Sequence, residues 1–333
     1  MPQLLGSLAR NRRLLREFVV RDLKARYVGS SMGFFWSVIF PVLNLFIYMF
    51  VFRMVLNVRF EDQAGPADTA IWMLAGITVW VAFAESVSRT TNCLVENSNL
   101  IQKVVFPSEV LPVYLVSSSL INMCIGLPVV LGGVAWFAYL GPWLDPEDVH
   151  TASLGSLEIF EPIAHRHLTL AHPLVLVGPW PSDELHTASL GSQEIFIPPV
   201  HRDLALGLPI VALPLLMFLQ AVFTIGLGCV LATLNLFLRD TFHLVGVFVT
   251  VWMFATPIFY PDYLVSKAQD GQFAWLLDIN PMYWLIESYR SVLLFAHWPD
   301  PWMLVRFALV ALATFLLGST FFMRQKPIFP DLL

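Results

Sequence analysis

Charged side chains are scarce in this chain of 333 residues: 13% are Asp, Glu, Lys or Arg, whereas 57% are hydrophobic. Soluble globular proteins are about 25% charged, so this chain has too little polar surface to cover a water-soluble fold. Four long runs carry no charge at all, and they lie at 34–52, 110–140, 204–238 and 241–261. A helix crosses the hydrocarbon core with about 20 apolar residues. These runs, with shorter ones at 69–84 and 307–323, predict an all-α integral membrane protein with six transmembrane helices.

Cysteine is equally rare, and the chain also lacks a cleavable leader pattern. Cys93, Cys124 and Cys229 lie in or beside apolar runs, and their spacing fits neither a disulfide framework nor a zinc site. We interpret them as small buried hydrophobic side chains. The first 30 residues are charged and have no apolar core before a small-residue cleavage site. The first membrane helix is therefore expected to act as the insertion signal.

Catalytic and nucleotide-binding motifs are missing. No glycine is followed by lysine, which excludes a phosphate-binding loop of the Gly-x-x-x-x-Gly-Lys-Ser/Thr type, and neither Gly-x-Ser-x-Gly, His-Glu-x-x-His nor Asp-x-Asp occurs. Charge in the predicted spans, the usual mark of ion coupling, is scarce, and the main cases are Glu85 and Arg306 near span ends. Secondary transporters tend to carry more such charge together with broken helices. The sequence therefore favours a transporter that borrows an ATPase and is not itself an enzyme.

The distribution of basic residues predicts the orientation. Twelve of the nineteen lysines and arginines lie in segments that share one side of the membrane if both termini are cytoplasmic. These are seven residues between Arg10 and Arg26, together with Arg89, Lys103, Arg239, Arg324 and Lys326. The positive-inside rule then places both termini in the cytoplasm, in agreement with an even number of spans.

The pattern divides the chain into five parts. Residues 8–30 read as an amphipathic interfacial helix, because Leu15, Val19 and Leu23 repeat every fourth position among basic residues. The remaining parts are transmembrane helices 1–3 at 34–140 with a cytoplasmic loop at 92–108, an external insertion at 141–203, transmembrane helices 4–6 at 204–323, and a cytoplasmic tail at 324–333. Residues 262–300 are apolar but too polar and too short to cross twice, so they predict a re-entrant helical hairpin on the outer side.

The external insertion contains a tandem duplication. Residues 150–170 and 186–206 share 15 of 21 identities, and both copies contain the sequence His-Thr-Ala-Ser-Leu-Gly-Ser. Two readings stay open: a tolerated loop insertion, or an external module that touches the exported substrate or a partner. The histidine spacing matches no metal-ligand pattern.

One segment carries a specific resemblance. Residues 97–112 follow the pattern N-x-x-L-I-x-K-V-x-F-P-x-x-x-L-P, and 21–27, 238–240, 257–260 and Asn280-Pro281 support it. With these features the chain resembles the permease subunit of type-2 ABC exporters, in the branch that exports O-antigen, capsular polysaccharide or teichoic acid. The resemblance covers residues 11–140 and 205–333 and excludes the duplicated insertion.

The resemblance implies a homodimer in the bacterial inner membrane that binds two copies of an ABC ATPase. ATP and magnesium would sit on that partner, so this chain would hold no cofactor and no metal. Residues 96–107 would form a coupling helix, with Asn97 and Asn99 as candidate caps. The implied ATPase-coupling residues are Glu96, Asn97, Asn99, Leu100, Ile101, Lys103, Phe106, Pro107, Arg239 and Asp240.

The implied substrate is a polysaccharide on its lipid carrier, translocated through a channel between the two copies. Arg21, Lys24 and Arg26 would meet the pyrophosphate of that lipid. The candidate channel-lining residues are Trp36, Phe40, Tyr48, Trp80, Glu85, Tyr114, Trp252, Tyr260, Tyr283 and Trp284. Two alternatives remain: a type-2 exporter of a drug or small lipid, and a membrane-embedded glycan-modifying enzyme.

The enzyme alternative depends on the duplicated histidines, which are its main candidates for acid or base chemistry. Replacing His150 and His186 with Ala is expected to leave export almost unchanged if the chain is a permease. Measuring glycan at the cell surface of the double variant tests this, because an enzyme that used these side chains would lose its turnover.

Overall fold

The computed structural model describes residues 2–27, 66–103, 106–136, 204–267, 272–273 and 275–333, with a few isolated residues between 35 and 51. In this part of the chain every regular element is a helix, apart from a single β-bridge between Ala205 and Phe295. The first predicted span, 34–52, lies almost entirely outside the described residues, and the duplicated insertion at 141–203 lies outside them too. The expectation of an all-α protein is confirmed for the described part.

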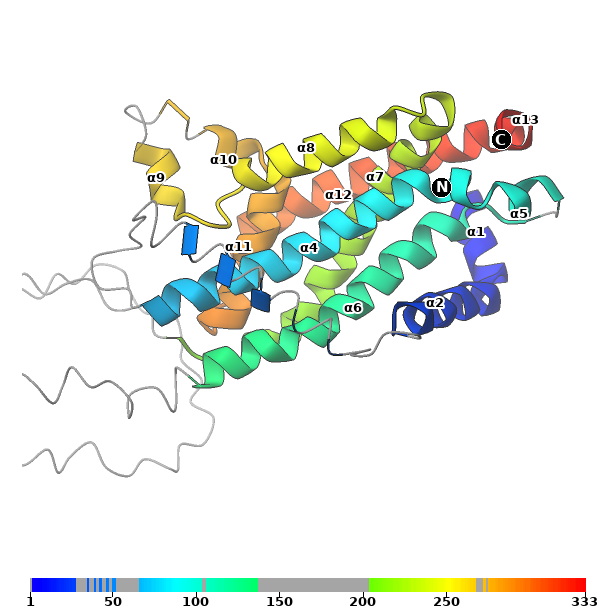
Figure 1. Cartoon of the computed structure of the whole chain (residues 1–333). Coiled ribbons are helices and arrows are strands. Elements are labelled where there is room, and N and C mark those ends of the chain that lie inside the picture. Colours follow the sequence, from blue (N-terminus) through cyan, green and yellow to red (C-terminus); the bar gives the residue numbers. More distant parts are fainter. Residues whose placement is uncertain are drawn as a thin grey trace, which may run out of the picture. The chain divides into compact units, whose positions relative to one another are not determined.

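Four long helices form the bundle in Figure 1. They are α4 (Pro66–Glu96), α6 (Val110–Ala135), α7 (Leu213–Phe237, after the short 3-10 turn η6, Leu208–Ala212) and α12 (Pro301–Gln325). A 25-residue helix is about 38 Å long, so each one exceeds the hydrocarbon thickness of about 30 Å. By length and composition all four can cross a membrane. The chain is therefore a multi-pass membrane protein, while the total of six spans stays a prediction.

Two of these helices are longer than their charge-free runs. The expected span 69–84 continues as α4 to Glu96. Glu85 and Arg89 form ion pairs within this helix, so their charges are neutralised and the helix does not end there. The expected span 307–323 begins earlier, at Pro301, where the Asp300 carboxylate accepts a hydrogen bond from Trp302 N at 2.9 Å. Proline at the first helical position and Asp before it are favoured starts. The first five residues of the expected cytoplasmic loop 92–108 are thus helical, as the last part of α4.

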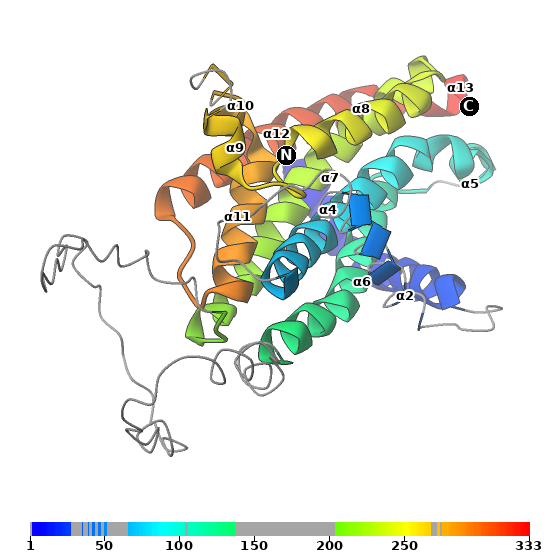
Figure 2. The ribbon, with the colours of Figure 1, turned by 60° about the vertical axis from the view of Figure 1, so that its left-hand side comes forward.

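The fifth predicted span is shorter than a full crossing helix. Helix α8 (Thr241–Ala255) has 15 residues and is followed by an irregular segment up to Tyr260. Three short helices come next: α9 (Asp262–Lys267), α10 (Trp275–Ile279) and α11 (Pro281–Leu294). Figures 1 and 2 both show α9 and α10 at the end of the bundle opposite α5 (Ser98–Lys103). We call the two ends of the bundle the α5 end and the α9 end.

The N-terminal segment is two helices, not one. Helix α1 (Pro2–Arg10) and helix α2 (Arg12–Tyr27) are separated at Asn11, whose side-chain Nδ2 donates to Ser7 O at 2.9 Å. The apolar face of α2 packs on α6: the Phe18 ring lies 5.2 Å from Tyr114 and 5.7 Å from Phe106. At Phe18 the apolar face of the expected interfacial helix therefore contacts protein.

The C-terminal part of the chain is held by close contact between α7 and α12. A Cβ atom added to Gly318 would lie 2.0 Å from the carbonyl oxygen of Gly226, and one added to Gly226 would lie 2.5 Å from Phe315 Cα. Small residues let helix backbones approach in this way, and in membranes such packing replaces the missing hydrophobic driving force. Glycine is therefore required at both positions, and α7 and α12 form a rigid pair.

This contact gives a direct stability prediction. Replacing Gly318 with Ala forces the two backbones apart, and overpacking of this kind costs about 1–3 kcal/mol or more. The thermal midpoint of the detergent-purified protein should fall clearly for Gly318→Ala. Gly246→Ala on α8 is the matched control, since a Cβ there meets nothing within 4 Å. Equal midpoints for the two variants would contradict the assignment.

Candidate functional site

The segment expected to couple to an ATPase contains a short helix at one end of the bundle. Helix α5 follows α4 after Asn97, whose carbonyl accepts from Leu100 N at 3.0 Å and Ile101 N at 3.2 Å. The Asn97 side chain donates to Cys93 O at 2.8 Å and so closes α4. Asn99 is exposed within α5, so the expectation that it caps this helix is wrong.

The other residues of this segment divide between the surface and the interior. Glu96 is exposed and accepts from Asn92 Nδ2 at 2.8 Å, and Leu100 is partly exposed. Ile101 is 8% exposed and packs inward. Pro107 O accepts from Val110 N at 2.9 Å at the start of α6. Helix α5 thus turns one face to solvent and anchors the other, while the Lys103 side chain lies outside the described residues.

The turn between α7 and α8 lies at the same end of the bundle as α5 (Figure 1). Arg239 and Asp240, both expected to face the ATPase, are exposed there. Sequence reasoning missed Asn235, whose Oδ1 accepts from Phe242 N at 3.1 Å and whose Nδ2 donates to Asn92 Oδ1 at 3.3 Å. These bonds tie the turn to α4, close to where α5 begins. The available signal was the pair Asn92 and Asn235, which lie five residues before the motif at 97–112 and three residues before the motif at 238–240.

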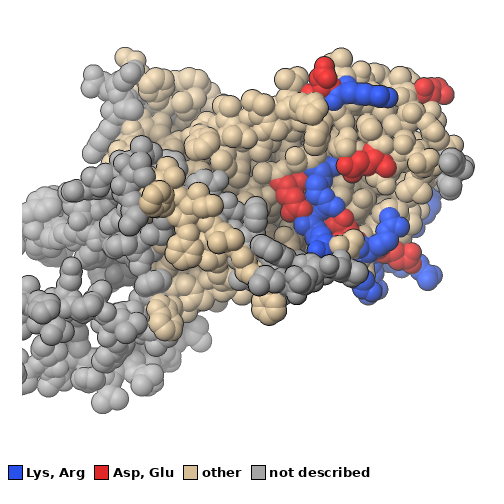
Figure 3. Space-filling model, viewed as in Figure 1, with Lys and Arg blue, Asp and Glu red and all other residues tan. Residues whose placement is uncertain are grey.

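Charged residues concentrate on the part of the molecule near the α5 end in Figure 3, and a cluster among them joins three helices. Asp22 on α2 accepts from Arg89 through both carboxylate oxygens, one of them at 3.0 Å from Nη1, and from Ser118 Oγ on α6 at 2.5 Å. Arg26 contacts Glu85 at 2.5 Å and Asp22 at 3.2 Å. Two acids and two arginines therefore neutralise one another between α2, α4 and α6.

The pKa of the Asp22 carboxyl lies below its ordinary value of 3.8. Burial raises this pKa, but the hydrogen bonds from Arg89 and Ser118 and the charges of Arg89 and Arg26 outweigh it. A lowered pKa in the folded state means that the ion pair stabilises the fold above pH 3.8. That contribution is lost as the pH falls through the lowered value.

The structure separates the three residues expected to meet a pyrophosphate. Arg26 has 19% of its side chain exposed and is already bound to Glu85 and Asp22. Arg21 and Lys24 are exposed, and the Arg21 guanidinium lies 4.7 Å from the Phe18 ring centroid. Glu85, expected to line a channel, belongs to the ion-pair cluster in this structure. Arg21 and Lys24 are thus the members of the set with their cations on the surface.

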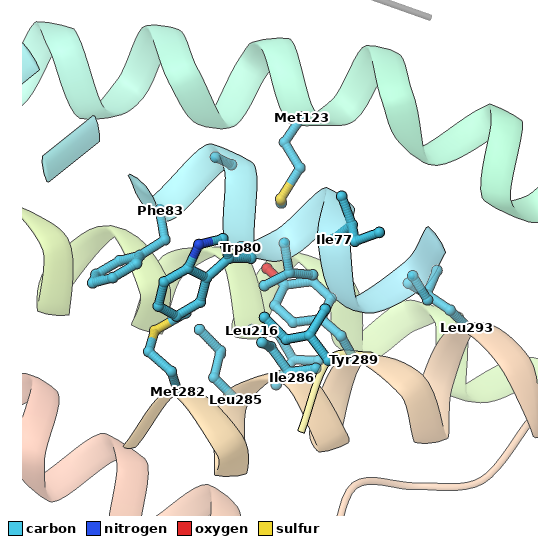
Figure 4. Packing of buried hydrophobic residues seen from close by; sticks show 14 of the residues in the cluster. Ile77, Trp80, Phe83, Met123, Leu216, Met282, Leu285, Ile286, Tyr289 and Leu293 are labelled. Atoms are coloured by element: carbon cyan, nitrogen blue, oxygen red, sulfur yellow. The ribbon is translucent and has the colours of Figure 1, made fainter. Parts of the chain in front are cut away.

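The aromatic residues expected to line a channel lie mostly in the core of the single chain. Trp80, Tyr114, Tyr283 and Trp284 are each at most 9% exposed. Trp80 packs edge-on against Trp252 at 6.1 Å, and Figure 4 shows it among Phe83, Met282 and Leu285. Tyr260 is partly exposed and donates to Phe254 O at 2.6 Å. Packing therefore explains these rings in this arrangement, whereas Trp36, Phe40 and Tyr48 lie outside the described residues.

At the α9 end, Asn280 joins the end of α8 to the start of α11. Its Oδ1 caps α11 by accepting from Met282 N at 3.1 Å, and it also accepts from Trp252 Nε1 at 2.9 Å. Its Nδ2 donates to Thr256 Oγ1 at 2.9 Å. The Asn-Pro pair is thus a helix start that also fixes the irregular segment after α8.

Arg290 fixes the same segment from the middle of α11. It is fully buried, with its guanidinium 3.2 Å from the Trp72 ring centroid of α4 and bonded to Pro257 O at 2.9 Å and Ile258 O at 3.3 Å. Gly76 provides the space, since a Cβ there would lie 2.6 Å from Arg290 Nη2. The sequence analysis did not predict the burial of Arg290. Within the described part, no group of His, Cys, Asp or Glu is arranged to hold a metal ion.

Comparison with known proteins identifies the family. Residues 13–147 and 195–294 match the ABC-2 type transporter family, which is more than half of the chain, so the chain belongs to that family. The O-antigen export system permease protein RfbA of Myxococcus xanthus is 27% identical over 332 residues, 99% of each chain. Two proteins of the same name from Klebsiella pneumoniae are 24% and 23% identical over 272 residues, 82% of this chain and 76% of theirs.

The comparisons bear on the sequence-based resemblance in two ways. Recognition of the exporter permease family from the segment around α5 is confirmed. The family match omits residues 148–194, most of the duplicated insertion, whereas the alignment with the Myxococcus xanthus protein covers 99% of this chain and so includes that segment.

The Asp22 cluster yields the prediction for this site. Asp22→Asn leaves Arg89 and Arg26 without their shared carboxylate, and losing a charged hydrogen-bond partner in a partly buried site costs about 2 kcal/mol or more. The measurement is the denaturation midpoint of the purified protein. The difference from wild type should shrink as the pH falls below 3.8, because protonation then removes the same charge.

The control is Glu17→Gln on the same helix. Its ion pair with Arg13 has side chains 63% and 93% exposed, and exposed pairs contribute about 0–1 kcal/mol. If the midpoint of Glu17→Gln were as low as that of Asp22→Asn, the loss of any negative charge from α2 would explain the destabilisation, and the ion-pair cluster would not.

Proposed function

We propose that the chain is the transmembrane subunit of an ATP-driven exporter that moves a polysaccharide, still attached to its lipid carrier, across the bacterial cytoplasmic membrane. One observation carries the proposal: a protein named as an O-antigen export permease aligns with this chain over 99% of both. Membership of the ABC-2 family and the four apolar helices of spanning length support it.

The proposal includes a separate ATPase that binds the α5 end. An exposed face of α5 and the exposed turn at Arg239 and Asp240 lie together there, and charged residues gather near them (Figure 3). A short helix with its inner face anchored in the protein suits a contact that must transmit force. ATP and magnesium belong to the partner, the α5 end faces the cytoplasm with both termini, and this chain contributes no catalytic residue.

The proposal also includes a second copy of the chain and six spans in each copy. Helix α8 has one buried residue, Val245, and its remaining surface is unusually apolar. The exposed large hydrophobic side chains on it are Phe242, Leu244, Val247, Phe248, Val251 and Phe254. The exposed side chains of Arg21 and Lys24 provide cations for the phosphates of a lipid-linked substrate.

Co-purification tests the proposal. The tagged permease extracted in mild detergent from its native host should bring with it one soluble ATPase in equal amount. Leu100→Ala, on the outer part of α5, should reduce the ATPase recovered per permease by about tenfold, which corresponds to about 1.4 kcal/mol of binding. A wild-type chain that purifies without any ATPase would overturn the proposed function.

Leu264→Ala provides the matched control. Leu264 is a 40% exposed leucine on α9, at the opposite end of the bundle. The amount of ATPase should be the same as with wild type. A loss equal to that of Leu100→Ala would indicate general damage to the protein and not a contact at α5.

A further inference from the structure

The chain does not leave the bundle after its last long helix. The 3-10 turn η8 (Lys326–Ile328) and helix α13 (Phe329–Leu332) follow α12 directly and return to the α5 end. Phe329 is fully buried, 5.1 Å from the Phe322 ring of α12, and it shares an apolar cluster with Ile101 of α5 and Leu111 of α6. Helices α13 and α5 contact each other, and both lie at this end in Figure 1.

A buried carboxylate binds the same segment by charge. Glu109, the residue before α6, is 1% exposed and accepts from Lys326 Nζ at 2.5 Å and from Ser7 Oγ of α1. Burial raises the pKa of Glu109, but the hydrogen bonds from Lys326 and Ser7 outweigh it, and the net pKa is lowered. An unpaired charge at this depth would be strongly unfavourable, so Glu109, Lys326 and α1 stay together.

These contacts close a path between the two places that face the proposed ATPase. Helix α5 contacts the C-terminal segment 326–333, which continues α12. The pair Gly226 and Gly318 leaves no clearance between α12 and α7, and α7 leads into the turn at Arg239 and Asp240. A displacement of α5 therefore has a packed route to that turn besides the route along α4 and α6.

We propose that the C-terminal segment 326–333, held by Lys326 on Glu109 and by Phe329, is a mechanical link that couples α5 to α12 and α7. The inference rests on the proposed function, because it assumes an ATPase that displaces α5. Lys326 and Phe329 are positioning residues in this scheme: they contact neither the ATPase nor the substrate, and they determine how much transport each ATP produces.

The test uses the full exporter, permease with its co-purified ATPase, in proteoliposomes that contain the host's lipid-linked glycan. Lys326→Met and Phe329→Ala should each bind the ATPase in the wild-type amount and hydrolyse ATP. The glycan translocated per ATP hydrolysed should fall at least about fivefold, the lower range of common coupling effects. Lys326→Arg, which keeps the cation beside Glu109, should restore it. If Lys326→Met fails to fold, Phe329→Leu is measured in its place. This variant keeps an apolar side chain at position 329, and it should also lower the glycan translocated per ATP.

Two neighbours serve as controls. Arg324→Met removes an exposed cation two residues before Lys326, and Ile328→Ala removes a 42% exposed side chain beside Phe329. Both should leave glycan per ATP unchanged.

The outcomes separate the two proposals. Unchanged glycan per ATP in Lys326→Met and Phe329→Ala would overturn the mechanical link while the exporter function stands. Loss of the ATPase from these variants would overturn it as well, because the segment would then be part of the docking surface. A wild-type chain that binds no ATPase would overturn both proposals.

Discussion

The pairing of charge in apolar surroundings is the constraint on which this structure depends. A chain with so few charged residues can place them inside only where they neutralise each other. Asp22 and Glu85 meet Arg89 and Arg26, and through these pairs α2 is held against α4 and α6. Glu109 meets Lys326 and Ser7, which holds α1 and the C-terminal segment. The N-terminal and C-terminal segments are therefore parts of the bundle at the α5 end.

The opposite end follows the same rule with different partners. Arg290 is buried with one carboxylate partner, Glu287, at 3.5 Å, and backbone carbonyls and the Trp72 ring supply the rest of its environment. The irregular segment after α8 needs such partners, because its free carbonyls cannot face lipid. Asn280 and Arg290 together hold the irregular segment after α8 through hydrogen bonds to Thr256, Pro257 and Ile258. Ionic clusters thus organise the α5 end, and one buried cation with one amide organises the α9 end.

Much of this architecture could be predicted because membrane insertion acts on composition directly. The runs 110–140 and 204–238 became α6 and α7 with small differences at their ends, and the pattern at 97–112 identified the family before any contact was known. The sequence told least about individual charged and aromatic side chains, because it does not show their partners in the fold. Glu85 looked like a channel residue and Arg26 like a lipid contact, yet the two bind each other at 2.5 Å. Trp80 and Trp284 looked available to a sugar, yet both are buried.

Sequence alone determined the helical class, the membrane setting and the family, because each of these depends on local composition or on a contiguous motif. Tertiary structure decided which charges are paired, which rings are buried, and that the C-terminal segment returns to α5. Those features join residues far apart in the chain, such as Glu109 and Lys326 or Gly226 and Gly318. A pattern within one stretch of sequence does not say which distant residues will be in contact. Tertiary packing alone determines these pairs.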